Sequence, residues 1–219
     1  MSHLKSLSPA ALALALACAA NPSPASDPVA VDQPARPLAA LAAERIVVLP
    51  AQRLQGAGAM GWVDSIGPAA DYLSRLDNEI AFAVEQRGVR DWVFAPAIER
   101  SARRNPTVRV DPHALSVDRL RVAEEKTDEP IPEPLGSQLR NLTVITDSRY
   151  VVLPSELRFE PVAGQSAGTG RGVLVLYLID TRASRIIRKM EVASGAVPGF
   201  SPAIAAGIAG RFADLIAAP

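Results

Sequence analysis

The chain has 219 residues, of which 48% are hydrophobic and only 5% aromatic, so aliphatic side chains must fill its core. Its length, less a leader and a linker, suits a single domain. Lys and Arg together number 23, as do Asp and Glu, and the basic residues are spread along the chain, which argues against nucleic-acid binding. A single cysteine, Cys18, excludes an intrachain disulfide and a cysteine-based metal or redox site.

Residues 1–18 are predicted to be a secretory signal peptide. The apolar run from Leu7 to Ala17 is too short to span a bilayer but suits the core of such a signal. The run ends at Cys18 after small and aliphatic residues, which resembles a bacterial lipobox, in which the cysteine is lipidated and becomes the new N-terminus. Cys18 is therefore the candidate lipidation site, and the alternative is an ordinary signal cleaved near Ala20 or Ser26.

Residues 19–43 are predicted to be a disordered tether, because the stretch is rich in Pro and Ala and lacks a hydrophobic period. A lipid anchor would hold the protein on a membrane, since each buried methylene contributes about 0.8 kcal/mol. Ala19, and not Asp, follows the cysteine, so by resemblance to enterobacterial lipoproteins the expected location is the outer membrane, facing the periplasm. The folded domain is expected over residues 44–219.

The first half of this domain is predicted to alternate strands and helices. The apolar run from Ile46 to Pro50 indicates a buried strand, and the glycine-rich stretch 51–67 indicates a loop. Apolar residues at helical spacing predict a helix from Ala69 to Arg87, which Gly88 would cap. The further elements expected are a short strand at 92–94, a short helix at 96–104 and a helical segment at 114–123.

The second half is predicted to be a loop over 124–133, a helix around Leu135 to Leu142, three strands and a last helix. The strands expected are 150–159, 173–180 and 185–194, joined by turns at 164–172 and 181–184 into an antiparallel meander, with Pro154 interrupting the first of them. Ser201 and Pro202 suit the start of the final helix. The predicted fold class is therefore α/β (α+β), a single small domain with a mixed sheet and covering helices.

The order of these segments carries a family resemblance. The strand Ile46 to Pro50, the helix ending at Gly88, and the paired strands Tyr150 to Leu153 and Leu176 to Asp180 resemble a group of envelope proteins. That group includes the TolB amino-terminal domain, the penicillin-binding-protein activator LpoB and the curli secretion lipoprotein CsgG. The resemblance covers residues 44–217 and implies a module like the anticodon-binding fold.

Carboxylates and His113 are the residues with which the chain could carry out acid–base chemistry. Asp71, Asp77 and Glu79 lie on the long predicted helix, where Asp77 and Glu79 point in different directions, so all three are interpreted as solvated surface. His113, in a turn, is interpreted as a surface or capping residue. Gly168 to Gly172 precede a strand and not a helix, which indicates a hairpin turn and not a phosphate-binding loop.

Met60 and Trp62, in the glycine-rich loop, are possible partner contacts, because exposed apolar side chains on a loop can anchor a protein. The alternative is that both pack under the sheet.

The function expected is that of a membrane-anchored periplasmic lipoprotein, a non-catalytic binding or adaptor module for an envelope protein complex of cell-wall synthesis, secretion or assembly. Its partners would be an envelope protein of unknown identity and the membrane, with no nucleic acid, cofactor, metal or catalytic residue. Two alternatives stay open: a carboxylate-based enzyme acting on envelope material through Asp71 or Glu99, and a self-assembling (homo-oligomeric) secretion subunit.

Overall fold

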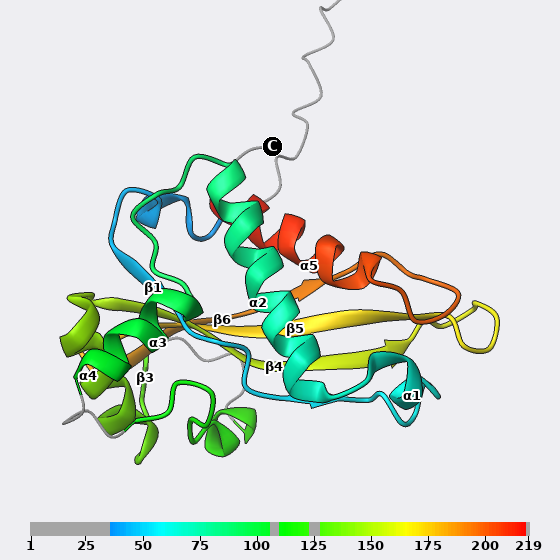
Figure 1. Ribbon diagram of the computed structural model, residues 1–219, viewed down its shortest axis with the longest axis horizontal. Helices are drawn as coiled ribbons and strands as arrows, with labels where there is room; N and C mark the ends of the chain where they lie inside the picture. The colour runs from blue at the N-terminus through cyan, green and yellow to red at the C-terminus, as the bar shows by residue number, and fades with distance from the viewer. Residues whose placement is uncertain (1–35, 106–109, 123–127, 218–219) are drawn as a thin grey trace, which may run out of the picture. The chain divides into compact units, whose positions relative to one another are not determined.

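The computed structural model describes residues 36–105, 110–122 and 128–217 (Figure 1). The predicted signal peptide, Cys18 and the tether up to residue 35 lie outside the described residues. Within the described part, the chain forms one α/β domain in which a six-stranded mixed sheet carries helices on both faces, which confirms the predicted fold class. No helix of the described ranges is long and apolar enough to cross a membrane.

The sheet is built around the predicted meander. Its strands follow the order β1-β4-β5-β6-β3, and β2 also pairs with β4. Both β1 and β2 run parallel to β4, whereas the other neighbours are antiparallel. The strand bounds are β1 Ile46–Val48, β2 Leu54–Gln55, β3 Glu129–Pro130, β4 Tyr150–Pro161, β5 Gly170–Asp180 and β6 Arg185–Ala193.

Two hydrophobic cores lie on opposite faces of this sheet. The helices α2 (Ala69–Gln86) and α5 (Ala203–Asp214) cover one face, where Leu76, Leu176 and Phe212 belong to the same buried core. The other face is covered by α3 (Ala95–Arg104) and α4 (Leu135–Thr146), together with the segment 110–120. Because β5 is covered on both faces, its residues are apolar in an unbroken run instead of alternating.

Short and irregular elements depart from the predictions. The strand β4 continues past Pro154. The pairing register shifts at a bulge between Pro154 and Glu156, and a bulge tolerates a proline, which has no backbone N–H to donate. The predicted loop 51–67 contains β2 and the short helix α1 (Val63–Ile66). The predicted helix 114–123 is reduced to the 3-10 helix η2 (Asp118–Val122), and the predicted loop 124–133 includes β3.

Two boundaries also differ. The strand expected at 92–94 makes a single bridge, between Val93 and Val47. Residues 36–43, which the tether was predicted to include, pack on the domain. They contain the 3-10 helix η1 (Ala39–Leu41), and Leu38 is fully buried while its N–H donates a hydrogen bond to the Leu215 carbonyl at 3.0 Å. The folded part therefore begins before residue 44, because Leu38 adds apolar area to the core.

Candidate functional site

The two predicted partner contacts, Met60 and Trp62, are buried to different extents. Trp62 is 5% exposed and lies edge-on to Phe159 and Phe200 at ring-centroid distances of 5.4 and 6.0 Å. Met60 is partly buried against the same core. The loop therefore packs under the sheet as the alternative interpretation expected, and a partner could reach Met60 but not the Trp62 ring. Partner contact at this loop stays a prediction.

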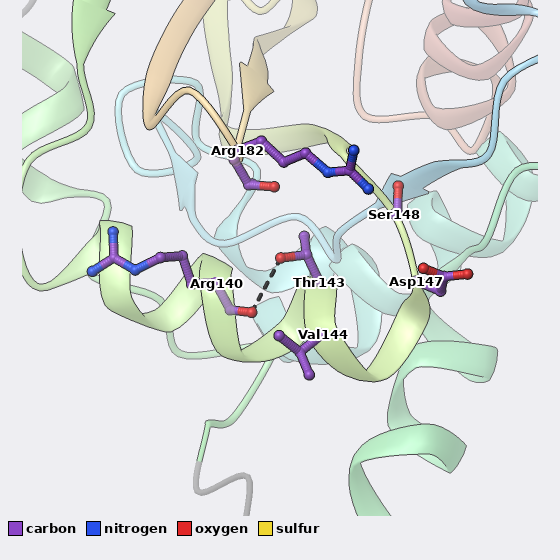
Figure 2. Close-up of a pocket in the computed structure, with 7 residues that line it drawn as sticks. Arg140, Thr143, Val144, Asp147, Ser148 and Arg182 are labelled. Carbon is purple, nitrogen blue, oxygen red and sulfur yellow. Dashed lines mark hydrogen bonds between the residues drawn. The ribbon is translucent and has the colours of Figure 1, made fainter.

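A hollow of about 320 Å³ lies instead where α4 ends and β4 begins (Figure 2). Three parts of the chain line it: the last turns of α4, the connection to β4, and the turn between β5 and β6. We call it the α4 groove. Its lining residues are Arg140, Thr143, Val144, Asp147, Ser148, Thr181 and Arg182.

Local hydrogen bonds fix the floor of the α4 groove. Asp147 ends α4 in the left-handed conformation, with φ 48°, and turns the chain toward β4. The hydroxyl of Ser148 then donates to the Arg45 carbonyl at 2.7 Å. The Thr181 N–H and hydroxyl both donate to the Arg149 carbonyl, at 3.0 and 2.8 Å. These hydroxyls are occupied by the fold and position the groove without being free for a ligand.

Asp180 holds the turn that carries Arg182. Its carboxylate accepts a hydrogen bond from the Arg149 guanidinium at 2.9 Å, and further bonds from the N–H groups of Arg182 and Ala183 at 3.0 Å each. The bonds from Arg149 lower the pKa of this buried carboxyl, and the two backbone bonds act in the same direction. The turn is therefore fastened in one conformation next to the groove.

The side chains that the α4 groove offers to a ligand are Val144 and Arg182, and Arg140 lies beside them. Val144 is 80% exposed and projects from α4, and Arg182 extends across the groove toward Ser148 (Figure 2). The Arg140 guanidinium bonds Glu133 at 2.9 Å and the Ser137 hydroxyl at 2.8 Å. An exposed aliphatic side chain between arginines suits a protein surface that presents an apolar group and a carboxylate.

A second cluster lies at the C-terminal end of β1. Asp77 is only 8% exposed, so its interpretation as solvated surface is wrong, whereas Asp71 and Glu79 are exposed as expected. The Asp77 carboxylate accepts a hydrogen bond from the Ala51 N–H at 2.9 Å. Burial raises the pKa of Asp77 to about 7, against the lowering effects of the Ala51 bond and of nearby His113.

His113 and Glu99 complete this cluster. His113 is exposed, as predicted, and its Nε2 lies 3.0 Å from Oε1 of Glu99 on α3. Of the two carboxylates proposed for catalysis, Glu99 therefore belongs to the cluster. Asp71, six residues before Asp77, lies about 9 Å from it along the axis of α2. A carboxyl with a pKa near 7 beside a histidine can exchange protons at neutral pH.

The signal that could have revealed Asp77 was present in the sequence. Asp77 lies four residues after Leu73 and three before Ile80, on the apolar face of the helix. The two-residue spacing between Asp77 and Glu79 predicted that their side chains point in different directions. It did not decide which of the two faces the core. In the described ranges, no three His, Cys, Asp or Glu side chains gather closely enough to hold a metal ion.

Comparisons with known proteins give distant structural neighbours. No family model matches the chain, and no curated protein matches it. The LpoB C-terminal domain from Salmonella enterica covers 69% of this chain and 80% of its own length, with 13% identity and a TM-score of 0.35. A PelC dodecamer from Paraburkholderia phytofirmans covers 81% and 91%, with 11% identity and a TM-score of 0.38. LpoB is one of the proteins named in the resemblance above, but TM-scores this low carry no argument about function.

Proposed function

We propose that this chain is a lipid-anchored protein of the bacterial cell envelope whose domain is a non-catalytic binding module for a protein partner. The anchor is supported by the place of Cys18, the one cysteine of the chain, at the end of an apolar leader. The binding role is supported by the α4 groove, which is the observation that carries the proposal. The complexes it would serve are those of cell-wall synthesis, secretion or assembly.

The α4 groove has the composition of a contact region for protein. Val144 would lose most of its exposed surface under a partner, and burial of an aliphatic side chain drives association. Arg182 would meet a carboxylate of the partner, and arginine is enriched in interfaces relative to the rest of a protein surface. Because Asp180 and Ser148 already fix the backbone around the groove, little ordering would be needed on binding.

Val144→Asp is expected to weaken partner binding without harming the fold, because the side chain is exposed. A photo-crosslinking residue at position 144 should give a discrete adduct in cells, whose partner is then purified. Affinity of the full chain for that partner, measured by titration calorimetry, should fall at least about tenfold in Val144→Asp.

Phe82→Asp is the matched control, because Phe82 is an exposed apolar side chain, 60% accessible, on α2. It should leave the affinity unchanged. If Phe82→Asp weakens binding and Val144→Asp does not, the partner uses the α2 face and the proposal for the groove is wrong. An adduct consisting of two copies of this chain, with a matching sedimentation mass, would favour the self-assembling alternative.

Cys18→Ser is expected to release the protein from the membrane. Wild type should fractionate with the outer membrane and carry the mass of a lipidated N-terminus, whereas the variant should be recovered in the periplasmic fraction. Intact mass spectrometry and membrane fractionation measure both. An unmodified wild-type chain cleaved beyond Cys18 would refute the anchor but leave the test at Val144 valid.

The carboxylate enzyme remains a second candidate because of one observation, the cluster of Asp77, Glu99 and His113. The raised pKa of Asp77 would let it act as a general acid or base at neutral pH. Loss of turnover on cell-wall material in Asp77→Asn, with partner binding retained, would favour this candidate over the binding module.

A further inference from the structure

Asp77 is a buried carboxyl placed on the apolar face of α2, among the residues that form the core under β1. It is 8% exposed and accepts a hydrogen bond from the Ala51 N–H at 2.9 Å. An ionised carboxylate in such a place is costly unless several donors or a paired cation compensate it. The segment that contains Ala51 supplies this donor and contacts the carboxyl, so the surroundings of Asp77 depend on the place of that segment.

Two segments are fastened together beside Asp77. Gln52 donates from Nε2 to the carbonyls of Pro50 and Pro112, at 2.7 and 2.8 Å, and its Oε1 accepts from the Leu115 N–H at 2.8 Å. The one side chain thus links residues 50–52 to residues 112–115. Displacement of either segment would therefore disturb the other and give water access to Asp77.

Charged groups on both segments and on α3 act on this carboxyl. His113 attracts the ionised form of Asp77, and Glu99 opposes it. Glu99 is itself bonded to His113 at 3.0 Å and lies 3.5 Å from the Arg103 guanidinium. Their neighbours are also engaged: Asp111 accepts from the His113 N–H, and Arg53 pairs with Asp118.

We propose that Asp77, Glu99 and His113 form a proton-controlled clasp: segments 50–53 and 111–115 stay closed over α2 and α3 while Asp77 carries a proton, and open more readily once that proton is lost. The geometry supports this because closure buries Asp77 and opening hydrates it. The clasp does not depend on the partner or the anchor proposed above.

The direction of the pH effect follows from proton linkage. The pKa of Asp77 is about 7 in the closed state, and hydration in the open state would return it toward its ordinary value of 3.8. Between these values the closed state binds more protons, so a rise in pH favours opening. The opening constant should increase by up to about tenfold per pH unit in this window and level off above it.

Amide hydrogen exchange at Ala51 tests the clasp, because its N–H is the donor to Asp77. Base-catalysed exchange from an opened amide rises about tenfold per pH unit, and the linked opening adds up to about another tenfold. In the full chain, Ala51 exchange should therefore rise by up to about a hundredfold per unit between pH 4 and 7. Asp77→Asn, which keeps an acceptor for the Ala51 N–H, should show the ordinary tenfold dependence.

The Gly170 amide serves as an internal reference, because it donates to the Val197 carbonyl at 2.9 Å in a different part of the fold. It should show the ordinary tenfold dependence in both proteins. A hundredfold dependence at both amides would mean global unfolding, and a tenfold dependence at Ala51 in wild type would mean no linkage. Either result overturns the clasp.

Variants of the neighbouring charges give a second test. Glu99→Gln removes a charge that repels ionised Asp77, so the extra rise in the Ala51 exchange rate should stop at a lower pH. His113→Gln removes an attracting charge, so that rise should stop at a higher pH. If either variant is poorly folded, carbon-13 titration of the Asp77 carboxyl in wild type decides the matter. A titration midpoint near the ordinary value of 3.8 would overturn the proposal.

Discussion

Asp77 and Asp180 are both buried carboxyls, and their surroundings have opposite effects on them. Asp180 accepts hydrogen bonds from a guanidinium and two backbone N–H groups, which lower its pKa. Asp77 has a backbone N–H as hydrogen-bond donor and only the partial support of His113, so burial dominates and raises its pKa. At the scale of single residues, the number and charge of donors decide whether a buried carboxyl stabilises the fold when ionised.

Asp77→Asn is expected to remove one component of the pH dependence of stability. The folded-state pKa of Asp77 lies above its unfolded value of 3.8, so its contribution is fully present below about pH 4 and is lost as pH rises through about 7. Above pH 7 the variant should be more stable than wild type by about 2–4 kcal/mol, and below pH 4 the two should agree.

Urea unfolding of both proteins at pH 4, 6 and 8 measures this difference. Groups with lowered pKa values, such as Asp180 and Glu133, affect both proteins alike and cancel in the comparison. A constant difference at all three pH values would mean that Asp77 does not titrate in this window.

At the scale of elements, the close contact between β5 and α5 requires glycine, which has no side chain, at position 172 of β5. A Cβ at Gly172 would lie 2.7 Å from Cγ2 of Ile204 and 3.0 Å from Cδ1 of Ile208, both on α5. Neither isoleucine is exposed, so neither can move without disturbing the core. Glycine at this position therefore sets how closely the helix approaches the strand.

Gly172→Ala is expected to lower the free energy of unfolding by about 1–3 kcal/mol through overpacking. Gly58→Ala is its control, because a Cβ there meets nothing within 4 Å, and it should change stability by no more than about 1 kcal/mol. Thermal unfolding followed by circular dichroism compares the two. Equal stability of both variants would show that α5 can shift to accommodate the added methyl group.

The sequence predicts the elements whose own pattern is long enough to decide them. The helix α2 shows five apolar residues at helical spacing, and β5 is a run of eight apolar and acidic residues with strand-forming side chains. By contrast, β2 and β3 have two residues each and form only because β4 and β6 supply their pairing partners. The α4 groove was not predicted, because it combines residues from α4, the β4 connection and the turn at Arg182.

At the scale of the whole domain, residues 36–42, where the described part of the chain begins, contribute to the core. Leu38 is fully buried with the residues under α2 and α5, and Trp92 Nε1 donates to the Leu41 carbonyl at 3.3 Å. Near the other end of the described chain, Arg87, which follows α2, donates to the Ala217 carbonyl at 3.1 Å and pairs with Asp214 at 2.7 Å. Segments 36–42 and 212–217 are therefore bonded to each other, and the second is also bonded to the residue that follows α2.

Leu38→Ala is expected to destabilise the domain by about 2–5 kcal/mol, because it leaves a cavity in this core. Ala40→Ser, at an exposed position two residues later, should have little effect. Chemical denaturation of the full chain measures both. Wild-type stability in Leu38→Ala would show that residues 36–42 behave as part of the tether, as the sequence pattern suggested.

The fastening of residues 36–42 has a mechanical consequence for a protein held by its N-terminal end. If the chain is anchored at Cys18 as proposed, tension between the anchor and the domain would load the Leu38–Leu215 hydrogen bond and the buried Leu38 side chain first. The strand β1, which follows directly, would bear load only after these contacts had given way. Under a moderate pull the two cores, the α4 groove and the Asp77 cluster would keep their geometry.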